Sequence, residues 1–486
     1  MPTSVTRLFQ VDDNYHLTGW LFLKGLAIVY FIAFLSLAVQ IDGLAGPNGI
    51  IPFYQTLNRD YQELGWLGWL QVPTVFWLDA SDTALKLAAY GGAAMAILLL
   101  IGRWQTGSLI GMFILYLSLF HAGDIFLSFQ WDTLLLETGL LAIFLARSGP
   151  TGLVVFMLHW LLFRFRFMSG FFKLYSGDPS WANLTTLKYY FETQVLPHGG
   201  SWYFHQLPDW MLQGGVLLVF FTELVVPFFI FLPRPFRIAA ALITLFMQVL
   251  IMSTSNHNFV NLLVMVLCLF LLDDRFIERL LPRRMRQRAA VSAAVVPSAS
   301  MKVALGILSA LIFVTSIATF AWRTTTIRYP DLLSQTFTTM HMYGLGHIFH
   351  VYPTMQTERQ ELEIQGSYDG RNWYPYEFKY KPGPLNKRPP VNIPHQPRLD
   401  WMMWFLPPQG RKDDYWLHML LRRLQEGSPQ VLQLLEYNPF EERPPRYLRV
   451  LAFDYRFTTP EEKERTGNWW KRTYLGEFPN VRPRSP

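Results

Sequence analysis

A row of apolar segments that ends abruptly near residue 322 constrains this chain most. The segments lie at about 19–39, 84–101, 108–120, 133–146, 153–172, 213–232, 238–254, 259–273 and 302–322. A helix needs roughly 20 apolar residues to cross the hydrocarbon core, where every backbone polar group must find an internal partner. Residues 323–486 are polar by comparison and rich in Pro and Arg. The pattern predicts a polytopic α-helical membrane protein of about nine spans, residues 1–322, followed by a C-terminal domain, residues 323–486.

The charges of the loops predict the orientation of these spans. Cytoplasmic loops of membrane proteins carry an excess of Lys and Arg. One set of alternate loops carries Arg103, Arg147, Arg234, Arg237 and the arginines of 275–288, whereas the other carries Asp42, Asp60, Glu63, Asp79, Asp82, Asp124 and Asp132. The N-terminus is therefore expected in the cytoplasm. An odd number of spans then places the C-terminal domain outside the cytoplasm, in the periplasm for a bacterial inner membrane or in the lumen for an endoplasmic reticulum membrane.

Composition excludes several classes of function. Cys268 is the one cysteine, so the chain can form no internal disulfide and carries no CxxC redox motif. The net charge of +7 includes the arginine run at 275–288, and no basic stripe with interleaved aromatic residues stands out, so we expect no nucleic-acid partner. No metal-binding spacing is present either, and we expect no metal site.

Ionisable residues within the apolar segments are candidates for a functional site. They are Lys24, Glu137, His159, Arg164, Arg166, Lys173 and Glu223. A charge at this depth costs about 3 kcal/mol or more unless it meets a partner or a wet cavity. Arg164 and Arg166 either pair with Glu137 or Glu223 and hold helices together, or bind an anionic head group or substrate. The two arginines lie about 200° apart around a regular helix, so they cannot line one pocket.

Lys173 stands at the outer end of its segment and precedes a Tyr-Ser-Gly-Asp turn. One interpretation is that it snorkels, with its ammonium in the interface and its stem in the lipid. The other is that it is enclosed beside Trp181 and acts as a base, because desolvation lowers the pKa of a lysine.

The C-terminal domain mixes strands and helices. Residues 361–367 and 373–381 alternate in polarity around Asp369-Gly370, which predicts a β-hairpin. Segments 414–425 and 429–438 have the period of short amphipathic helices, and 446–458 alternates like a buried strand. We expect an α+β or β-sandwich-like domain with helical insertions.

Two aromatic and basic motifs stand out in this domain. They are RLDWMMWF at 398–405, which holds Trp401 and Trp404, and NWWKR at 468–472, which holds Trp469 and Trp470. Such residues either pack in a core or at the membrane edge, or form a surface that binds another protein.

Several of these strings together resemble one family. They are QWDTLLLETG (130–139), GDPSWANLTTLKYYFETQVLP (177–197), NFVNLLVMVLCLFLLDD (258–274), GSYDGRNWYPYEFKYKPG (366–383), HQPRLDWMMWF (395–405) and YNPF (437–440). Their pattern is similar to that of lipase maturation factors, and the similarity extends over most of the chain. It implies a chaperone-like membrane protein, of the endoplasmic reticulum in animals, that assists the folding or maturation of client proteins such as lipases. In that reading the outer domain touches the clients, and no catalysis is needed.

A shorter segment, RFRFMSGFFKLYSGDPSW (164–181), resembles part of the vitamin K-dependent γ-carboxylases. That resemblance implies a membrane enzyme acting on a quinol or lipid, with Lys173 as the base. Its site would lie within 131–192 and use Trp131, Asp132, Glu137, Arg164, Arg166, Asp178 and Glu192. The maturation reading instead predicts sensitivity to substitution at 398–405 and 468–472. Membrane lipids are partners in both.

Overall fold

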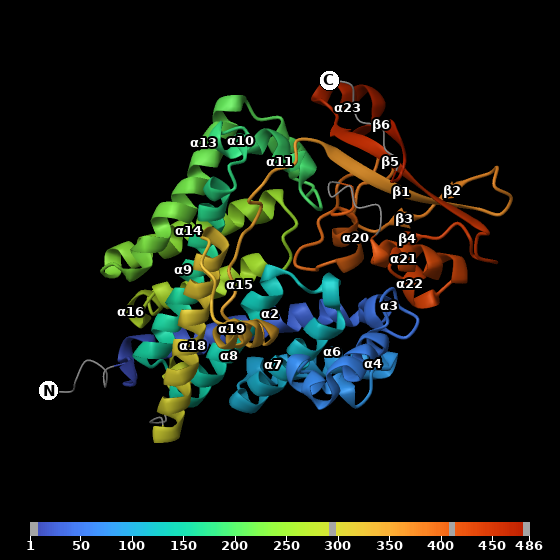
Figure 1. The fold of residues 1–486 in the computed structure, drawn as a ribbon. Helices are drawn as coiled ribbons and strands as arrows, with labels where there is room; N and C mark the ends of the chain where they lie inside the picture. Colours follow the sequence, from blue (N-terminus) through green and yellow to red (C-terminus); the bar gives the residue numbers. More distant parts are fainter. Residues whose placement is uncertain (1–7, 291–297, 408–413, 480–486) are drawn as a thin grey trace.

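The computed structural model describes residues 8–290, 298–407 and 414–479. Within these residues, seven helical stretches are long and apolar enough to cross a membrane, which confirms the polytopic helical class. They are Asp13–Ala38 (η1 Asp13–Tyr15 and α2 His16–Ala38), α6 (Asp82–Ile101), α7 (Gln105–Ala122), α9 (Gly152–Tyr175), Asp209–Phe231 (α13 Asp209–Phe220, η5 Phe221–Val225 and η6 Val226–Phe231), α14 (Arg234–Thr254) and α18 (Ala299–Thr324). In Figure 1 these helices fill the left and lower parts of the molecule, and the strands lie at the upper right.

The other two expected spans are also helical, but each departs from a typical span. Helix α8 (Gln130–Ser148) is long enough, yet Asp132, Glu137 and Arg147 make it less apolar. Helix α15 (Val260–Leu267) continues as the 3₁₀ turn η7 (Cys268–Leu271), and together they extend only about 20 Å. Most of both segments is buried among the other helices, where neighbouring protein groups replace lipid.

Polar contacts at the helix ends show how the short segment runs. The backbone N–H of Thr18, near the start of α2, donates to Asp274 Oδ1 at 2.8 Å. Arg234, the first residue of α14, forms an ion pair with Asp273. The segment 260–271 therefore ends where α2 and α14 begin, which is the alternation expected of a full crossing.

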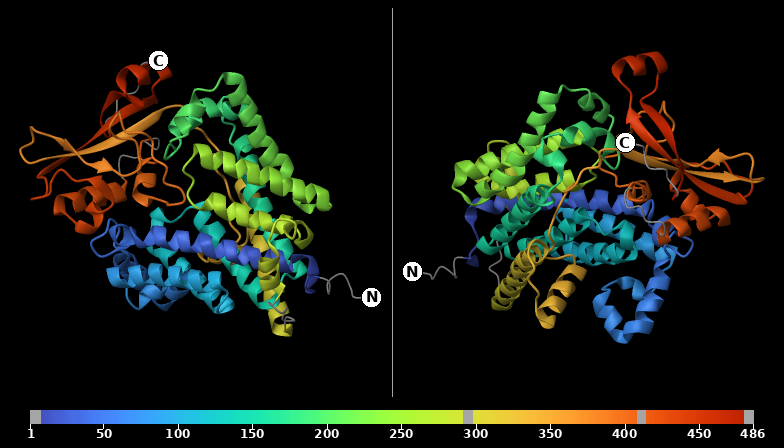
Figure 2. Two further views of the ribbon diagram at one scale, coloured as in Figure 1. Left: turned by 180° about the vertical axis from the view of Figure 1, so that it is seen from behind. Right: turned by 45° about the horizontal axis from the view of Figure 1, so that its top comes forward.

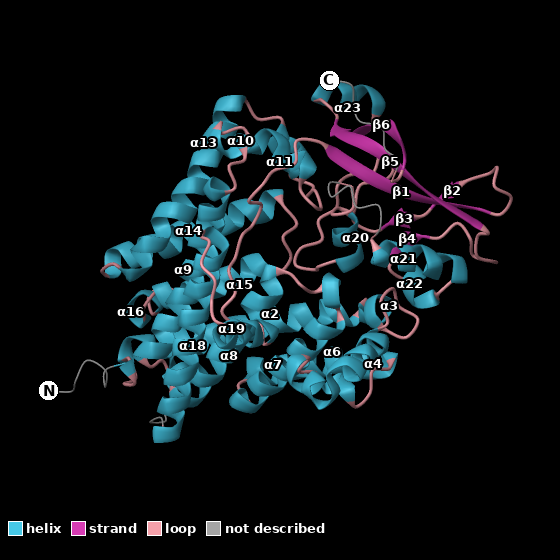
Figure 3. Cartoon of the chain, in the orientation of Figure 1, coloured by secondary structure: helices cyan, strands magenta, loops and turns pink. Residues whose placement is uncertain are grey.

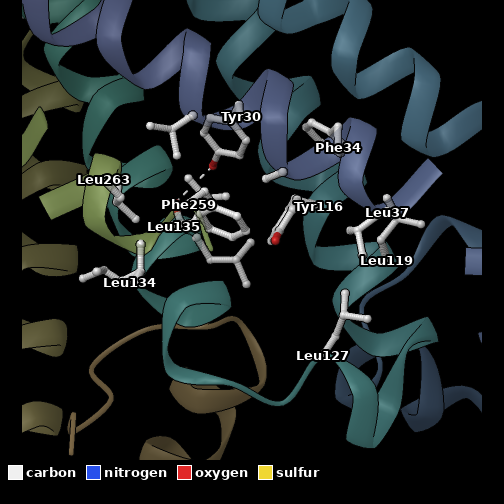
Figure 4. Packing of buried hydrophobic residues seen from close by; sticks show 14 of the residues in the cluster. Tyr30, Phe34, Leu37, Tyr116, Leu119, Leu127, Leu134, Leu135, Phe259 and Leu263 are labelled. Carbon is white, nitrogen blue, oxygen red and sulfur yellow. Dashed lines mark hydrogen bonds between the residues drawn. The ribbon is translucent and has the colours of Figure 1, made fainter. Parts of the chain in front are cut away.

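Large side chains fill the space between α2, α7 and α8. The rings of Phe34 and Tyr116 meet edge to face with centroids 5.3 Å apart, and Tyr30 donates its hydroxyl to Leu135 O at 3.2 Å (Figure 4). A Cβ at Gly139 would lie 1.9 Å from the Tyr30 hydroxyl oxygen. The absence of a side chain at Gly139 therefore leaves room for the Tyr30 ring between α2 and α8.

The C-terminal part contains two antiparallel sheets. A four-stranded sheet has the order β2-β1-β5-β6, and a two-stranded sheet pairs β3 with β4. Their bounds are Arg359–Ser367 (β1), Tyr374–Pro375 (β2), Glu377–Phe378 (β3), Leu435–Tyr437 (β4), Tyr447–Phe457 (β5) and Trp470–Glu477 (β6). The expected hairpin around Asp369-Gly370 is confirmed by the pairing of Gln365 with Pro375. Its second strand, expected at 373–381, is wrong beyond Pro375, because residues 377–378 pair with β4 in the other sheet. The expected strand at 446–458 is confirmed as β5, which lies between β1 and β6.

Shorter helices complete the fold (Figure 3). Among the described residues they are α3 (Ile41–Ala45), α4 (Phe53–Leu64), η2 (Gly65–Leu67), α5 (Gly68–Gln71), η3 (Val75–Trp77), η4 (Asp124–Phe126), α10 (Pro179–Ala182), α11 (Thr186–Thr193), α12 (Ser201–His205), α16 (Asp274–Ile277), α17 (Arg283–Ala290), α19 (Asp331–Met342), α20 (Arg398–Met403), α21 (Tyr415–Glu426), α22 (Pro429–Leu432) and α23 (Pro460–Thr466). Helix α21 confirms the helix expected at 414–425. The helix expected at 429–438 is wrong beyond Leu432, because residues 435–437 pair with β3 instead.

Helices α20, α21 and α22 lie between the four-stranded sheet and the end of the bundle formed by α2 and α3 (Figures 1 and 2). Helix α22 contacts α3, and α20 contacts η4. The C-terminal part thus packs against the helical part. We call the contact between them the junction, and its buried polar groups define the candidate site.

Candidate functional site

Asp132, at the start of α8, is joined to the C-terminal part by an ion pair with no exposure to solvent. Both terminal nitrogens of Arg398 lie 2.7 Å from its carboxylate oxygens, one on each. The hydroxyl of Tyr116 donates to the same carboxylate at 2.7 Å. A paired, hydrogen-bonded carboxylate of this kind is held in one position, and loss of either partner leaves a buried charge.

The chain just before Arg398 is hydrogen-bonded to residues at the end of α2. The backbone N–H of Gln396 donates to Ser36 Oγ at 3.0 Å, and Gln40 donates its side-chain amide to Gln396 O at 2.8 Å. Gln40 Oε1 in turn accepts the backbone N–H of Arg398 at 2.8 Å. The segment 395–398 is therefore fixed to α2 before Arg398 reaches α8.

Aromatic rings pack around this ion pair. Trp131 and Trp401 meet edge to face with centroids 5.0 Å apart, and Phe129 stacks on Trp131 at 4.8 Å. Trp404 donates its indole N–H to Thr193 O at 2.8 Å. Trp401 is 5% exposed, so the packing interpretation describes it and the expectation that it forms an exposed patch is wrong.

Glu137, one helical turn or so below Asp132 on α8, forms an ion pair with Arg164 of α9. Its other oxygen accepts the backbone N–H of Gly346 at 2.9 Å, and Arg164 donates to His347 O at 3.0 Å. Both charged side chains are fully buried. The expected partnership of Glu137 with Arg164 is confirmed, and it also anchors the segment after α19.

Lys173 belongs to a second buried group. Its ammonium lies 2.7 Å from Glu223 Oε2 and 2.9 Å from Ser169 Oγ, and it lies over the ring of Trp181 at 5.3 Å from the centroid. Lys173 is 4% exposed, so the snorkelling interpretation is wrong. Enclosure beside Trp181 is confirmed, with Glu223 as its ion-pair partner.

Arg166 completes this group. One of its terminal nitrogens is 3.6 Å from Glu223 Oε1 and another donates to Thr222 Oγ1 at 3.3 Å. Glu223 lies in η5, a single π-helical turn, a feature often found at functional sites. The prediction that Arg164 and Arg166 cannot line one pocket is confirmed, because they pair with different carboxylates on different helices.

Asp178, just before α10, and Glu192, in α11, contact the C-terminal part. Asp178 caps α10 through the N–H of Ser180 at 2.8 Å and accepts the N–H of Met355 at 2.7 Å. Glu192 pairs with Arg456 at 2.8 Å and accepts the N–H of Phe457 at 3.0 Å. Both carboxylates thus fix β5 and the chain before β1 to the helical part.

Trp469 and Trp470, in the motif at 468–472, are less exposed to solvent than a protein-binding surface requires. Trp470 is 1% exposed and stacks on Phe457 with centroids 4.3 Å apart. Trp469 is half-buried, with Lys463 over its ring at 4.2 Å. Trp470 is a core residue, and the surface interpretation is wrong for it.

Comparisons with known proteins decide the family. The family model of the lipase maturation factor transmembrane domain matches residues 17–279, and that of the lipase maturation factor C-terminal domain matches residues 343–480. Human lipase maturation factor 2 is 32% identical, covering 94% of this chain and 81% of its own length. Mouse lipase maturation factor 1 is 30% identical, covering 96% and 88%. The chain belongs to the lipase maturation factor family.

Xenopus laevis lipase maturation factor 2 is 30% identical, again over 94% of this chain and 81% of its own length. No solved structure matches the chain. In the structure the two matched regions meet directly, because Asp132 falls in the first and Arg398 in the second. The two domains are therefore joined by buried charges as well as by the connecting chain.

Several residues of the junction were missed by the sequence reasoning. Arg398 stands inside a motif chosen for its tryptophans, although a basic residue in an apolar setting was itself the signal. Ser36, Gln40 and Tyr116 carry no signal in one sequence, because polar side chains in spans are common. Among the described residues, no group of three or more His, Cys, Asp or Glu side chains could hold a metal ion.

Proposed function

We propose that this protein is a membrane-anchored maturation factor whose C-terminal domain assists the folding of client proteins, lipases among them. The observation that carries the proposal is the buried junction of Asp132, Tyr116 and Arg398, together with membership of the family. A domain held in this way is presented in a constant orientation at the membrane surface, where secreted proteins emerge.

The same proposal includes an orientation. The ends of the helical segments that contact the C-terminal part are those that the loop charges place outside the cytoplasm, such as the ends of α2 and α9 and the start of α8. The C-terminal domain would then lie in the lumen of the endoplasmic reticulum, or in the periplasm if the host is a bacterium, with the N-terminus in the cytoplasm.

A second candidate is a membrane enzyme that acts on a quinol or lipid with Lys173 as base. The observation in its favour is that Arg166 and Lys173 share the single carboxylate of Glu223, which leaves the buried group with one excess positive charge. Such a group favours an anion. Against it, the ion pair with Glu223 stabilises the ammonium form, whereas a base must first lose its proton.

Complementation in a host that lacks the endogenous factor separates the two candidates. The measurement is the activity of a secreted lipase, divided by the amount of folded factor in the membrane. For the maturation factor, Lys173→Arg should leave this ratio unchanged and Arg398→Gln should lower it. For the enzyme, Lys173→Arg should abolish it, because a guanidinium does not give up its proton at neutral pH. A lipase that matures equally well with no factor present would contradict the proposal.

A further inference from the structure

A cavity of about 190 Å³ lies in the C-terminal domain, between the four-stranded sheet and the chain that follows β2. Its lining residues come from β1, β5, β6 and the segment 375–385. A cavity of about 150 Å³ can hold a benzene molecule. There is thus room for one aromatic or branched aliphatic side chain.

One wall of the cavity is a single face of the sheet. Glu361 of β1 pairs in register with Phe453 of β5, and Tyr455 of β5 pairs with Arg472 of β6. Residues paired in this way project to the same side of a sheet. Phe378 and Leu385 contribute apolar surface from the covering segment.

One carboxylate in the lining of the cavity has no ion-pair partner among the described residues. Glu361 is neutralised by Lys381 at 2.8 Å and by Arg359 at 2.6 Å. Glu363 is neutralised by Arg472 at 2.8 Å. Glu377 is half-buried and, among residues 8–290, 298–407 and 414–479, has no ion-pair partner. The cavity therefore offers a cation one unpaired carboxylate beside an apolar floor.

A strand edge lies next to this cavity. β6 is an outer strand of the four-stranded sheet, so one of its hydrogen-bonding edges has no neighbouring strand in the described structure. Arg472 of the same strand lines the cavity. An extended peptide can bind such an edge through its backbone, while a nearby pocket selects its side chains.

We infer that the cavity takes a large apolar side chain of an extended client segment that carries Lys or Arg two positions away, on the same face of that segment. The apolar side chain enters between Phe378 and Phe453, and the basic one reaches Glu377. This inference rests on the proposed function and gives it a chemical class of client: extended, incompletely folded segments in which an aromatic or branched residue lies two positions from a Lys or Arg.

The test uses the full-length protein in detergent and two short fluorescent peptides, each mostly Thr and Ser. One carries a central Phe-Thr-Lys sequence (the Phe-Lys peptide) and the other a central Phe-Thr-Glu sequence (the Phe-Glu peptide). Fluorescence anisotropy should show that the wild-type protein binds the Phe-Lys peptide more tightly. Glu377→Lys should reverse this order, with a change of roughly three- to tenfold for each peptide. A misfolded variant could lose binding, but it would not gain affinity for the Phe-Glu peptide.

Glu436→Lys is the matched control, because Glu436 is exposed on the neighbouring strand β4 and does not line the cavity. It should leave the order of the two peptides as in the wild type. The inference is overturned if neither peptide binds the wild type, if Glu377→Lys keeps the wild-type order, or if Glu436→Lys reverses it as well.

These outcomes are separable from failure of the proposed function. If the peptides are not discriminated while lipase maturation still depends on the factor, only the cavity assignment fails. If the peptides are discriminated as expected while lipase maturation is independent of the factor, the cavity assignment stands and the proposed function fails.

Discussion

Single side chains in this protein act mainly as partners for buried charges. Arg164, Arg398 and Lys173 each face a carboxylate on another element, and none is more than 4% exposed. A charge placed at such depth without a partner would cost several kcal/mol. These residues therefore specify which helices lie together.

We expect Glu137→Gln and Arg164→Gln each to lower the free energy of unfolding by about 3 kcal/mol or more, because each leaves one buried charge unpaired. The double variant should lose less than the sum of the two, since neither charge remains. Thermal unfolding in detergent measures this coupling. Purely additive losses would show that the pair contributes nothing beyond its separate members.

Some of these ion pairs could be predicted from the sequence. Charges within apolar segments are costly, so a partner for Glu137 on the arginine-containing segment could be expected from the sequence. The partner of Asp132 could not, because Arg398 follows it by 266 positions and only the folded chain brings them together. The burial of Trp401 and Trp470 was not predictable either, since aromatic residues with basic neighbours occur both in cores and on surfaces.

Elements in the bundle approach one another where glycine permits. On α9, a Cβ at Gly170 would lie 2.7 Å from Glu223 Cβ and 3.1 Å from the Glu223 carbonyl carbon. The backbone contact leaves little freedom to adjust, so α9 and the π-helical turn η5 would have to separate. That separation would lengthen the contact between Glu223 and Lys173.

We expect Gly170→Ala to destabilise the protein by about 1–3 kcal/mol, as overpacking typically does. Gly214→Ala on α13 is the matched control, because no atom lies within 4 Å of its added Cβ. It should be neutral or slightly stabilising, since alanine favours helix. Thermal unfolding of both variants is the measurement, and equal midpoints would contradict the close-packing argument.

The contact between α2 and the segment 395–398 should depend on pH. His395 lies 2.9 Å from Ser36 Oγ, and burial together with the charges of Arg398 and Lys379 lowers the pKa of His395 to about 4. In the unfolded chain the pKa of histidine is about 6.5. Between these values the unfolded state binds a proton that the folded state does not, so stability falls as pH falls, by at most about 1.4 kcal/mol per unit.

His395→Gln should remove this part of the pH dependence. The unfolding midpoint of the variant should fall less between pH 7 and pH 5 than that of the wild type. An unchanged slope in His395→Gln would show that another group is responsible.

Element boundaries were predicted best where one strong period dominates. The apolar segments, the turn at Asp369-Gly370 and β5 all follow from local pattern, whereas the strand after that turn ends at Pro375. Residues 435–437 have the helical period but form β4, because pairing with β3 and burial of Leu435 outweigh local preference. The segment 260–271 likewise could not be placed from local pattern alone, because its position inside the bundle depends on contacts with neighbouring helices.

At the scale of the whole molecule, the arrangement of helix ends predicts that the C-terminal domain and the arginine run lie on opposite sides of the membrane. In a Cys268→Ala background, Arg371→Cys lies in the exposed turn between β1 and β2, and Arg284→Cys lies at the start of α17.

A membrane-impermeant maleimide added to intact bacterial cells should label the cysteine at position 371 and leave that at position 284 unlabelled. In sealed microsomes, whose lumen the reagent cannot enter, the pattern should be the opposite. Permeabilised membranes serve as the control, because both positions should then react. Labelling at 284 on intact cells would mean that the proposed orientation is reversed.

The junction at Asp132 also bears on how the protein is made. Helix α8 leaves the ribosome long before Arg398 does, and at typical synthesis rates of 5–20 residues per second the interval is roughly 10–50 seconds. During that time the carboxylate of Asp132 has only Tyr116 as a protein neighbour from this cluster. Chains that end before residue 398 should accordingly be recognised as unfinished by membrane quality control, which would make the C-terminal domain a checkpoint for the assembly of the bundle beneath it.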